Sequence, residues 1–473
     1  MAKLLFLQNL EYEFLGPMYI SSMVKARHEC TLAVGAAAED FAAVMETFKP
    51  DVVAFSIMTG SHRWALNIAR ILKEKYNVLT LFGGAHPTFF PEFIEEEGVD
   101  IICRGEGEAA TLDLLDALDA GKDFSGIGNL YVKQKELISR NPVRPLDKEL
   151  DAYPFPDREL YKALGLGTDR SVRNIITSRG CMFHCSFCFE DSIRELYKDK
   201  GQHVRVRSIE KVIEELRELK LKHNVKTVYF CDDVFGINRK WLYEFLDVYK
   251  KEIGLDFLCL VRADIMCSDE NYAVKLKEAG CKSVFFGIES GSERLRNSVL
   301  NKNLKDKDIY EAARMLHKAG LPFRTYNIVG LPDETLEDAF NTVKMNIAIK
   351  ADYPWCSIFS PYPRTALTLY AQQQGYLAKD FSPDAISGSF FIDSQLTIPD
   401  IRRIENLHKF FQTAVLAPWT LPLVRILIKF PPNLMFRLWF GIIYFYVFLK
   451  SEKRSFFKTL GFALKSYKHV LKK

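Results

Sequence analysis

The sequence of 473 residues contains little cysteine and lacks both a short-period repeat and a low-complexity tract. Ten cysteines are too few for a disulfide scaffold, and in the expected reducing cytoplasm clustered cysteines more often bind metal or do chemistry. The amino terminus mixes acids into its apolar stretch, so a secretory signal is not expected. The 64 basic and 60 acidic residues nearly balance, which argues against bulk nucleic-acid binding. The composition, 48% hydrophobic and 26% charged, is typical of a soluble globular protein.

Acidic residues are almost missing from the carboxyl-terminal tail. From Leu407 to Lys473 the sequence has twelve Lys or Arg and one acid, Glu452, so the tail carries +11 and the preceding residues carry −7. The intensely apolar, uncharged run at residues 438–449 is shorter than the roughly 20 residues that a membrane-spanning helix needs. A basic, aromatic, amphipathic segment is typical of one that lies in a membrane interface. A core helix docked on the rest of the protein is the alternative.

Short apolar runs alternate with helical patterns in residues 1–135. Strands are expected at Leu4–Leu7, Asp51–Ile57, Val78–Phe82 and Asp100–Cys103, with helices near residues 16–27 and 63–76. This alternation predicts an α/β fold with an open, doubly wound parallel sheet, which binds ligands at the carboxyl ends of its strands. A connector with four prolines is expected over residues 136–165.

A second alternating series begins at Val172. Its expected strands are Asn174–Ser178, Thr227–Cys231, Phe257–Val261, Ser283–Ile288, Arg324–Val329 and Cys356–Ser360. Six repeats predict a (β/α)6 partial barrel over residues 166–375, shorter than the closed eight-repeat form. Residues 376–473 are expected to be mostly helical, with prolines interrupting very apolar segments.

Three cysteines, Cys181, Cys185 and Cys188, follow the first strand of this second series. Thiolates at this density suit an iron–sulfur cluster, or zinc with His184 as a fourth ligand. Three cysteines suit a four-iron cluster with one iron left open for a substrate. The other seven cysteines are scattered and are expected to lie in the core.

The Cys-x-x-x-Cys-x-Phe-Cys segment after a strand that opens a partial barrel resembles the radical S-adenosylmethionine (SAM) enzymes. The resemblance implies that the three cysteines are the catalytic, metal-binding residues, which hold a [4Fe–4S] cluster whose open iron binds SAM. Reduction then gives methionine and a 5′-deoxyadenosyl radical. The resemblance also implies that Glu289 and Ser290 contact the SAM amino group and that Arg262 contacts the SAM carboxylate. It places the loop after the fifth strand near the adenine of SAM. The SAM-binding residues it predicts are Phe187, Asp232, Arg262, Glu289, Ser290, Asn327, Gly330 and Tyr362.

The amino-terminal series before such a core resembles the cobalamin-binding subgroup, because small residues follow its expected strands. The cobalamin-binding residues predicted from this resemblance are Asn9, Gly16, Ser56, Thr59, Gly60, Gly83, Gly84, His86, Pro87 and Glu106. The first loop lacks the Asp-x-His-x-x-Gly motif, so no protein histidine is expected on cobalt. A flavodoxin-like domain that binds nothing is the alternative.

The resemblance implies a cytoplasmic enzyme in which a substrate radical takes a methyl group from methylcobalamin. Oxidative ring formation or carbon–carbon bond formation is the alternative reaction. A radical SAM enzyme with an empty first domain and a non-catalytic zinc protein are alternative identities. The expected partners are a small-molecule or lipid substrate, an electron donor such as flavodoxin or ferredoxin, and the inner face of a membrane. A lipid, an isoprenoid and a porphyrin are the substrate classes considered.

Overall fold

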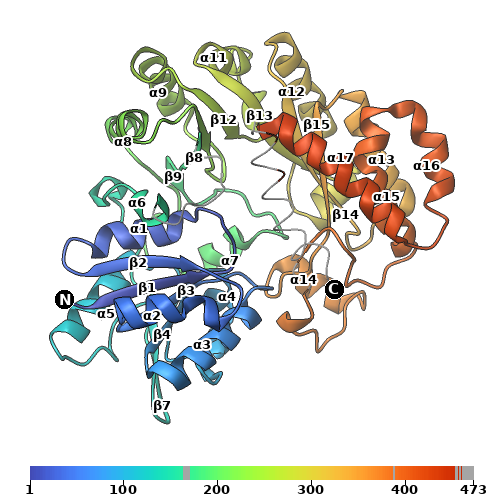
Figure 1. Ribbon diagram of the computed structural model, residues 1–473. Helices are drawn as coiled ribbons and strands as arrows, with labels where there is room; N and C mark the ends of the chain where they lie inside the picture. The colour runs from blue at the N-terminus through green and yellow to red at the C-terminus, as the bar shows by residue number, and fades with distance from the viewer. Residues whose placement is uncertain (163–170, 387–388, 453–455, 457–459, 461–473) are drawn as a thin grey trace. The chain divides into compact units, whose positions relative to one another are not determined.

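A computed structural model describes residues 1–162, 171–386, 389–452, 456 and 460. The chain forms two compact units, drawn in Figure 1. The first unit comprises residues 1–168 and 192–203, and the second comprises residues 169–191 and 204–473. Each unit is described by itself.

The first unit is built on a seven-stranded sheet in the order β2-β1-β3-β4-β5-β6-β7. Its strands are β1 (Lys3–Gln8), β2 (Glu29–Val34), β3 (Val52–Ser56), β4 (Leu79–Gly83), β5 (Ile101–Cys103), β6 (Leu130–Gln134) and β7 (Leu137–Arg140). Strands β1 to β5 pair in parallel, whereas β6 pairs antiparallel with both β5 and β7. The sequence patterns predicted four of these strands, and they did not predict the half-buried edge strand β2 or the β6–β7 hairpin.

Helices cover both faces of this sheet because alternate residues of each strand point to opposite sides. Leu4 and Phe6 of β1 pack in a core with helices α1 (Leu15–Val24) and α5 (Glu108–Asp119). Leu5 and Leu7 pack in a second core with α2 (Ala42–Phe48) and α3 (His62–Tyr76). The predicted doubly wound α/β arrangement is therefore confirmed.

The second unit is built on six parallel strands in chain order, as the repeat pattern predicted. They are β8 (Val172–Ile175), β11 (Thr227–Phe230), β12 (Asp256–Leu260), β13 (Cys281–Glu289), β14 (Phe323–Val329) and β15 (Tyr353–Ile358). The main helices between them are α8 (Ile209–Lys222), α9 (Arg239–Glu252), α11 (Tyr272–Glu278), α12 (Asp306–Lys318) and α13 (Leu336–Ala348). One face of the strands packs on these helices, and buried residues such as Phe230 and Phe286 form that core.

The opposite face of the six strands carries aromatic rings. The ring centroid of Phe285 lies 5.6 Å from that of Tyr229 and 6.3 Å from that of Tyr326. Arg324 also lies on this face, with its guanidinium 4.4 Å from the Phe285 ring centroid. The inner face of the partial barrel is thus aromatic and holds a buried cation.

The carboxyl-terminal helices are α14 (Ala366–Gln373), α15 (Ile401–Leu416), α16 (Leu421–Leu427) and α17 (Leu434–Glu452). Helix α15 packs on α13 and β15, and α17 packs on α15. The region expected as a separate part from residue 376 therefore shares a core with the barrel. The first unit likewise continues past residue 135, because β7 pairs with β6 and because residues 192–203 return to it.

Candidate functional site

The three cysteines lie on the loop between the two-residue strand β9 (Ser178–Arg179) and helix α7 (Phe189–Leu196). The Cys188 N–H donates to the Cys185 carbonyl at 3.0 Å, and the Cys181 N–H donates to the Glu190 carboxylate at 3.0 Å. Ser186 fixes the loop from the other side, because its N–H donates to the Leu300 carbonyl at 2.9 Å. The loop is therefore held by hydrogen bonds from its own N–H groups to the Glu190 carboxylate and to the Leu300 carbonyl.

Burial favours the protonated form of these three thiols. Desolvation raises the pKa of Cys181 and of Cys185, and it raises the pKa of Cys188 to about 12. Among the described residues, no three Cys, His, Asp or Glu side chains stand close enough to hold a metal ion as placed. Metal binding would displace the thiol protons, so this donor set suits a cluster that draws the cysteines together.

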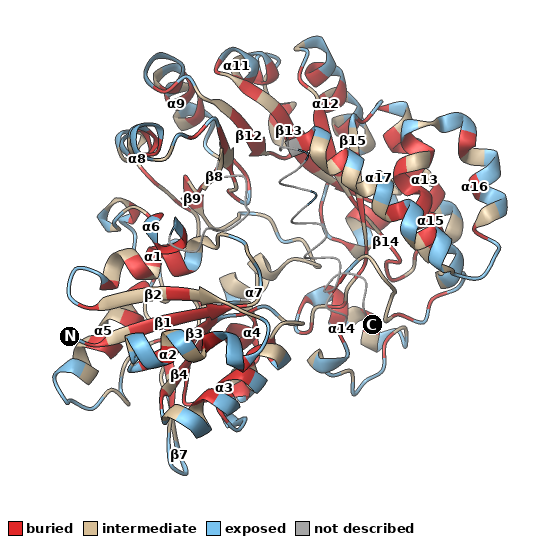
Figure 2. Cartoon of the chain, viewed as in Figure 1, coloured by how far each residue is buried: buried red, intermediate tan, exposed pale blue. Residues whose placement is uncertain are grey.

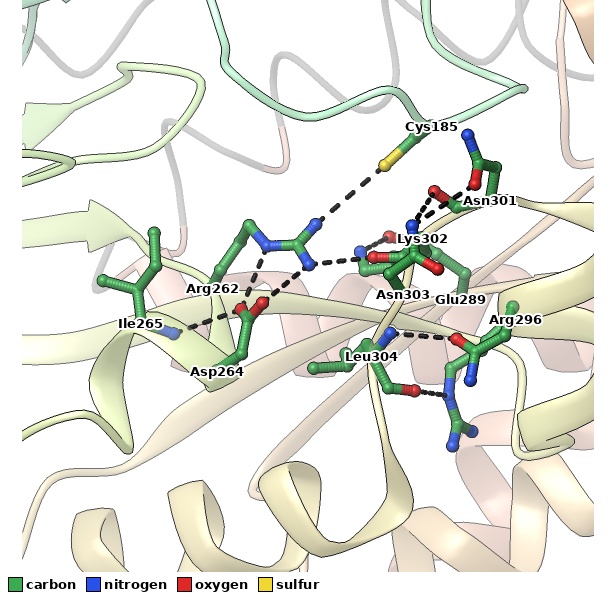
Figure 3. Close-up of polar contacts among 11 residues, drawn as sticks. Cys185, Arg262, Asp264, Ile265, Glu289, Arg296, Asn301, Lys302, Asn303 and Leu304 are labelled. Carbon is green, nitrogen blue, oxygen red and sulfur yellow. Dashed lines mark hydrogen bonds and ion pairs between the residues drawn. The ribbon is translucent and has the colours of Figure 1, made fainter.

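Arg262 brings positive charge to this loop from the end of β12, as Figure 3 shows. Its Nη1 lies 4.0 Å from Cys185 Sγ, and its guanidinium lies 3.6 Å from the Phe183 ring centroid. Asp264 accepts from Nε at 3.0 Å and from Nη2 at 2.9 Å. The paired carboxylate and the ring orient the guanidinium toward the cysteines.

A buried ion pair lies beside Arg262. Lys302 Nζ contacts Glu289 Oε1 at 2.7 Å, and the Lys302 carbonyl accepts from Arg262 Nη2 at 2.9 Å. Glu289 has a φ of 66° at the end of β13, where the pairing with β14 shifts register. Gly287 is required beneath the pair, because a Cβ there would lie 2.0 Å from Glu289 Oε1. The sequence patterns did not predict Lys302, although the Asn-Lys-Asn sequence around it marks a tight turn.

Several of the predicted SAM-binding residues form hydrogen bonds to other residues of the barrel. Asp232 is buried, and its Oδ1 accepts hydrogen bonds from both the N–H and the hydroxyl of Thr177 and of Ser178. Desolvation raises the pKa of Asp232, and its buried Oδ2 has no hydrogen-bond partner among the residues that the structure describes. Ser290 is buried directly after Glu289, and its Oγ accepts from the Ser292 N–H at 3.2 Å. Gly330 has a φ of 78°, and its N–H donates to the buried Glu334 carboxylate.

Asn327 does not join this group. Its amide donates to the Thr325 hydroxyl at 3.1 Å and to the Trp355 carbonyl at 2.9 Å, while its oxygen accepts from Asn346 of α13 at 2.8 Å. The reason is strand alternation, because Tyr326 and Ile328 point inward and Asn327 points to the helix layer. The structure therefore places this predicted SAM ligand behind the strand, with its polar atoms satisfied.

A mostly apolar pocket of about 200 Å³ lies at the carboxyl ends of β14 and β15. It is lined by Phe187, Ile328, Trp355, Ser357, Ile358, Phe359, Ser360, Tyr362 and Phe390. Phe187 comes from the cysteine loop, so the pocket brings together two predicted SAM-binding residues, Phe187 and Tyr362. Burial raises the pKa of Tyr362 and keeps its hydroxyl neutral.

In the first unit, the predicted cobalamin-binding residues follow β1, β3, β4 and β5. His86 is buried there, and its ring centroid lies 4.1 Å from that of His62 and 4.9 Å from that of Phe90. The Thr59 hydroxyl lies 3.1 Å from His86 Nδ1, and the Gly60 N–H donates to His62 Nδ1 at 3.1 Å. The two histidines are thus packed into the unit and held by the loop after β3.

The loops after β3 and β4 approach closely because of Gly84. Its φ is 92°, and a Cβ at this position would lie 2.6 Å from the Ile57 carbonyl oxygen. A Cβ on the neighbouring Gly83 would meet nothing within 4 Å. At the end of β5, the Glu106 N–H donates to the Tyr197 hydroxyl at 2.8 Å.

Of the remaining predicted residues, Asn9, Ser56 and Pro87 lie at or near the same strand ends, and Gly16 is the second residue of α1. Gly16 and Ser56 are exposed, Asn9 is half-buried, and Pro87 is buried beside His86. Met58, 60% exposed in the loop after β3, is an apolar candidate contact that sequence reasoning missed. An exposed large apolar side chain among small residues is the signal that marks it.

This chain combines a partial (β/α)6 barrel, in which three cysteines follow the first strand, with a doubly wound unit whose loops contain glycine. The combination is typical of radical SAM enzymes that carry a cobalamin-binding domain. Two family descriptions match the chain, "B12 binding domain" over residues 9–115 and "Radical SAM superfamily" over residues 175–345.

Individual relatives agree with these matches. An uncharacterized methyltransferase of Pyrococcus horikoshii, PH0819, is 34% identical over 369 residues, which are 76% of this chain and 78% of that protein. An anaerobic magnesium-protoporphyrin IX monomethyl ester cyclase of Rubrivivax gelatinosus is 27% identical over 385 residues, covering 77% of this chain and 66% of that protein. The structure of the radical SAM methyltransferase TsrM of Kitasatospora setae, with cobalamin and a [4Fe–4S] cluster bound, shares the fold. Its TM-score is 0.65 at 17% identity, covering 79% of this chain and 78% of that chain.

The chain belongs to the cobalamin-binding radical SAM enzymes. It is an enzyme, and its cofactors are a [4Fe–4S] cluster, SAM and cobalamin.

Proposed function

We propose that this enzyme transfers a methyl group to an unreactive carbon of an apolar, ring-containing substrate. The observation that carries the proposal is the aromatic inner face of the partial barrel, where the rings of Tyr229 and Tyr326 both lie beside that of Phe285. Aromatic side chains bind flat or apolar molecules through large contact areas. The similarity to an uncharacterized methyltransferase supports the reaction, and the similarity to a protein that acts on a magnesium porphyrin supports a substrate of this kind.

In this proposal Cys181, Cys185 and Cys188 hold the cluster. When bound, the cluster supplies the electron that cleaves SAM to a radical, and cobalamin supplies the methyl group. Glu289 offers a carboxylate to the ammonium group of SAM, and Arg262 offers a guanidinium to its carboxylate. Both side chains are buried and fixed by ion pairs, so little reorganisation is needed when SAM binds.

The pocket behind the cysteine loop would take the adenine end of SAM. Its walls are the Phe187 and Tyr362 rings, and Ser357 and Ser360 are the hydroxyl groups along it. A π-face with a few polar groups suits a purine ring. Asp232 and Ser290 lie buried at the ends of β11 and β13, and we assign them to hold the surrounding loops in place.

Cobalamin would bind at the strand ends of the first unit, with Thr59, Gly60, Gly83 and Gly84 allowing close approach of its lower face. We propose that no protein histidine binds cobalt. The packing of His86 between His62 and Phe90, with Nδ1 against Thr59, supports this, because a ligand role would require breaking those contacts.

A ring-forming reaction is the second candidate, favoured by the similarity to the Rubrivivax gelatinosus cyclase. Anaerobic incubation with SAM, cobalamin, a flavodoxin or ferredoxin reductant, and candidate porphyrins and isoprenoid lipids tests both. Methyl transfer gives a product heavier by one methylene group that carries deuterium from methyl-labelled SAM. Ring formation gives no label transfer. The Cys185→Ala variant is the control, and 5′-deoxyadenosine formed equally by that variant would refute the assignment of the cysteine loop.

A further inference from the structure

The second unit exposes a band of large apolar side chains near its carboxyl terminus. Eleven lie between residues 416 and 446, and Trp419 is 82% exposed and Ile442 is 64% exposed. The set is Leu416, Trp419, Leu423, Ile426, Phe430, Leu434, Met435, Leu438, Trp439, Ile442 and Tyr446. Soluble proteins rarely expose so many large apolar side chains together, and such a band marks an interaction surface.

Helix α17 presents two different sides. Phe436, Phe440 and Val447 are buried, and Phe436 and Phe440 face α15, where their ring centroids lie 4.8 Å from those of Phe410 and His408. Leu434, Leu438, Ile442 and Tyr446 recur every four residues on the opposite side, and all four are exposed. Figure 2 shows the exposed and half-buried residues along α16 and α17. The helix is therefore docked on the unit along one side and apolar on the other.

Two hydrogen bonds hold the helix on the unit, one toward each end. Trp439 Nε1 donates to the Thr413 hydroxyl at 2.8 Å near one end, and near the other end the buried Ser451 hydroxyl accepts from Arg324 inside the barrel. An 18-residue window of this helix, residues 434–451, has a mean hydropathy of 1.4, which meets the length and apolarity of a spanning helix. Spanning a bilayer would break both contacts, so the docking favours a helix that lies in a surface.

The segment that carries the band is positively charged, and one of its cations, Arg425, is paired with Glu337 of α13 at 3.5 Å. No Asp or Glu occurs between Leu407 and Ser451, whereas Arg425, Lys429, Arg437 and Lys450 all lie there. Lys429 and Lys450 are exposed at the ends of α16 and α17. Two copies of the chain joined through this face would bring like charges together, which disfavours a second copy as the occupant.

We propose that α16 and α17 bind this enzyme to the surface of an anionic lipid bilayer. The exposed side of α17 would enter the boundary between headgroups and acyl chains, and the lysines and arginines would lie at the anionic headgroups. Trp355 Nε1 donates to the Tyr444 hydroxyl of α17 at 3.4 Å, and Trp355 lines the apolar pocket. The proposed membrane-binding helix therefore contacts a wall of that pocket.

Co-sedimentation of the full chain with vesicles tests the proposal, using phosphatidylcholine alone and phosphatidylcholine with one-third phosphatidylglycerol. Binding to the anionic vesicles is expected at low salt, weaker but still measurable at high salt because only the charge attraction is screened. The variant Leu438→Glu/Ile442→Glu should lower the vesicle partition coefficient at least tenfold. Leu221→Glu, at an 85%-exposed position on α8, is the matched control and should bind like the wild type.

Melting temperature and light scattering complete the test. The double variant should have the same melting temperature as the wild type, because both positions are on the exposed side of α17. Wild-type protein that does not bind anionic vesicles at low salt overturns the proposal. So does a double variant that binds them unchanged, or a wild-type dimer that the double variant converts to monomer. None of these readouts uses catalysis, so the result is independent of the proposed reaction.

Discussion

Neutralising Glu289 should have two separable effects, because this carboxylate is paired inside the protein and also faces the proposed SAM site. The side chains of Glu289 and Lys302 are 9% and 7% exposed, and their charged atoms lie 2.7 Å apart. Removing one partner of such a pair leaves a buried charge without a counter-ion, which costs about 3–5 kcal/mol of folding stability. Glu289→Gln and Lys302→Met should each lose about this much, and the double variant should recover most of it, because no unpaired charge remains.

Urea unfolding followed by tryptophan fluorescence measures this effect, because four of the five tryptophans lie in the second unit. Glu311→Gln is the control, since Glu311 pairs with Arg314 on the surface and such a pair contributes only about 0–1 kcal/mol. If the free energy of unfolding of the double variant is as low as that of the less stable single variant, Glu289 and Lys302 are not a coupled buried pair.

The same variants separate stability from binding. Glu289→Gln should weaken SAM binding about 10- to 100-fold by losing a charge-assisted contact worth about 1.5–3 kcal/mol. The double variant should stay equally weak although its stability returns. Calorimetric titration of SAM into anaerobic, cluster-loaded protein tests this, and unchanged affinity in both variants would move the role away from Glu289.

Four further outcomes are expected. Replacing each loop cysteine with Ala, Cys188→Ala for example, should abolish iron binding and SAM cleavage, whereas Cys267→Ala outside the loop should bind iron as the wild type does. Gly84→Ala should lower cobalamin binding and destabilise the first unit by about 1–3 kcal/mol, because its left-handed backbone and close contact exclude a Cβ; Gly83→Ala, with open space, should do neither. Electron paramagnetic resonance of the Co(II) form should lack nitrogen splitting from a protein imidazole. Burial raises the pKa of Glu334 to about 8, so the folded protein holds this carboxyl in its protonated form. The stability that the protonated carboxyl contributes is therefore full below pH 4.5 and is lost as the pH rises through about 8. Glu334→Gln should remove that loss in unfolding experiments between pH 6 and 9, and an identical pH profile would contradict the prediction.

Apolar periodicity was enough to predict most of the strands, but not the elements whose stability comes from their neighbours. Helix α8 (Ile209–Lys222) shows what a local pattern can specify, because its sequence carries a regular apolar stripe and a serine cap. Strand β2 escaped prediction because it is an edge strand with only Leu32 buried, so its alternation is weak. The hairpin of β6 and β7 turns at Lys135, which has a φ of 55° and no glycine or asparagine to mark it.

The sequence by itself was enough to predict the chemistry of the cysteine loop, because three thiols at this spacing after a strand are a local pattern that needs no tertiary contact to recognise. It also determined the alternation of strands and helices in both units. Only the tertiary structure decided which groups meet. Lys302 reaches Glu289 across thirteen residues through a turn of left-handed asparagines, and Asn327 faces α13 because of strand alternation. Helix α17 has one side in the core and one side exposed, which its mostly apolar sequence could not reveal, because burial depends on what packs against each side.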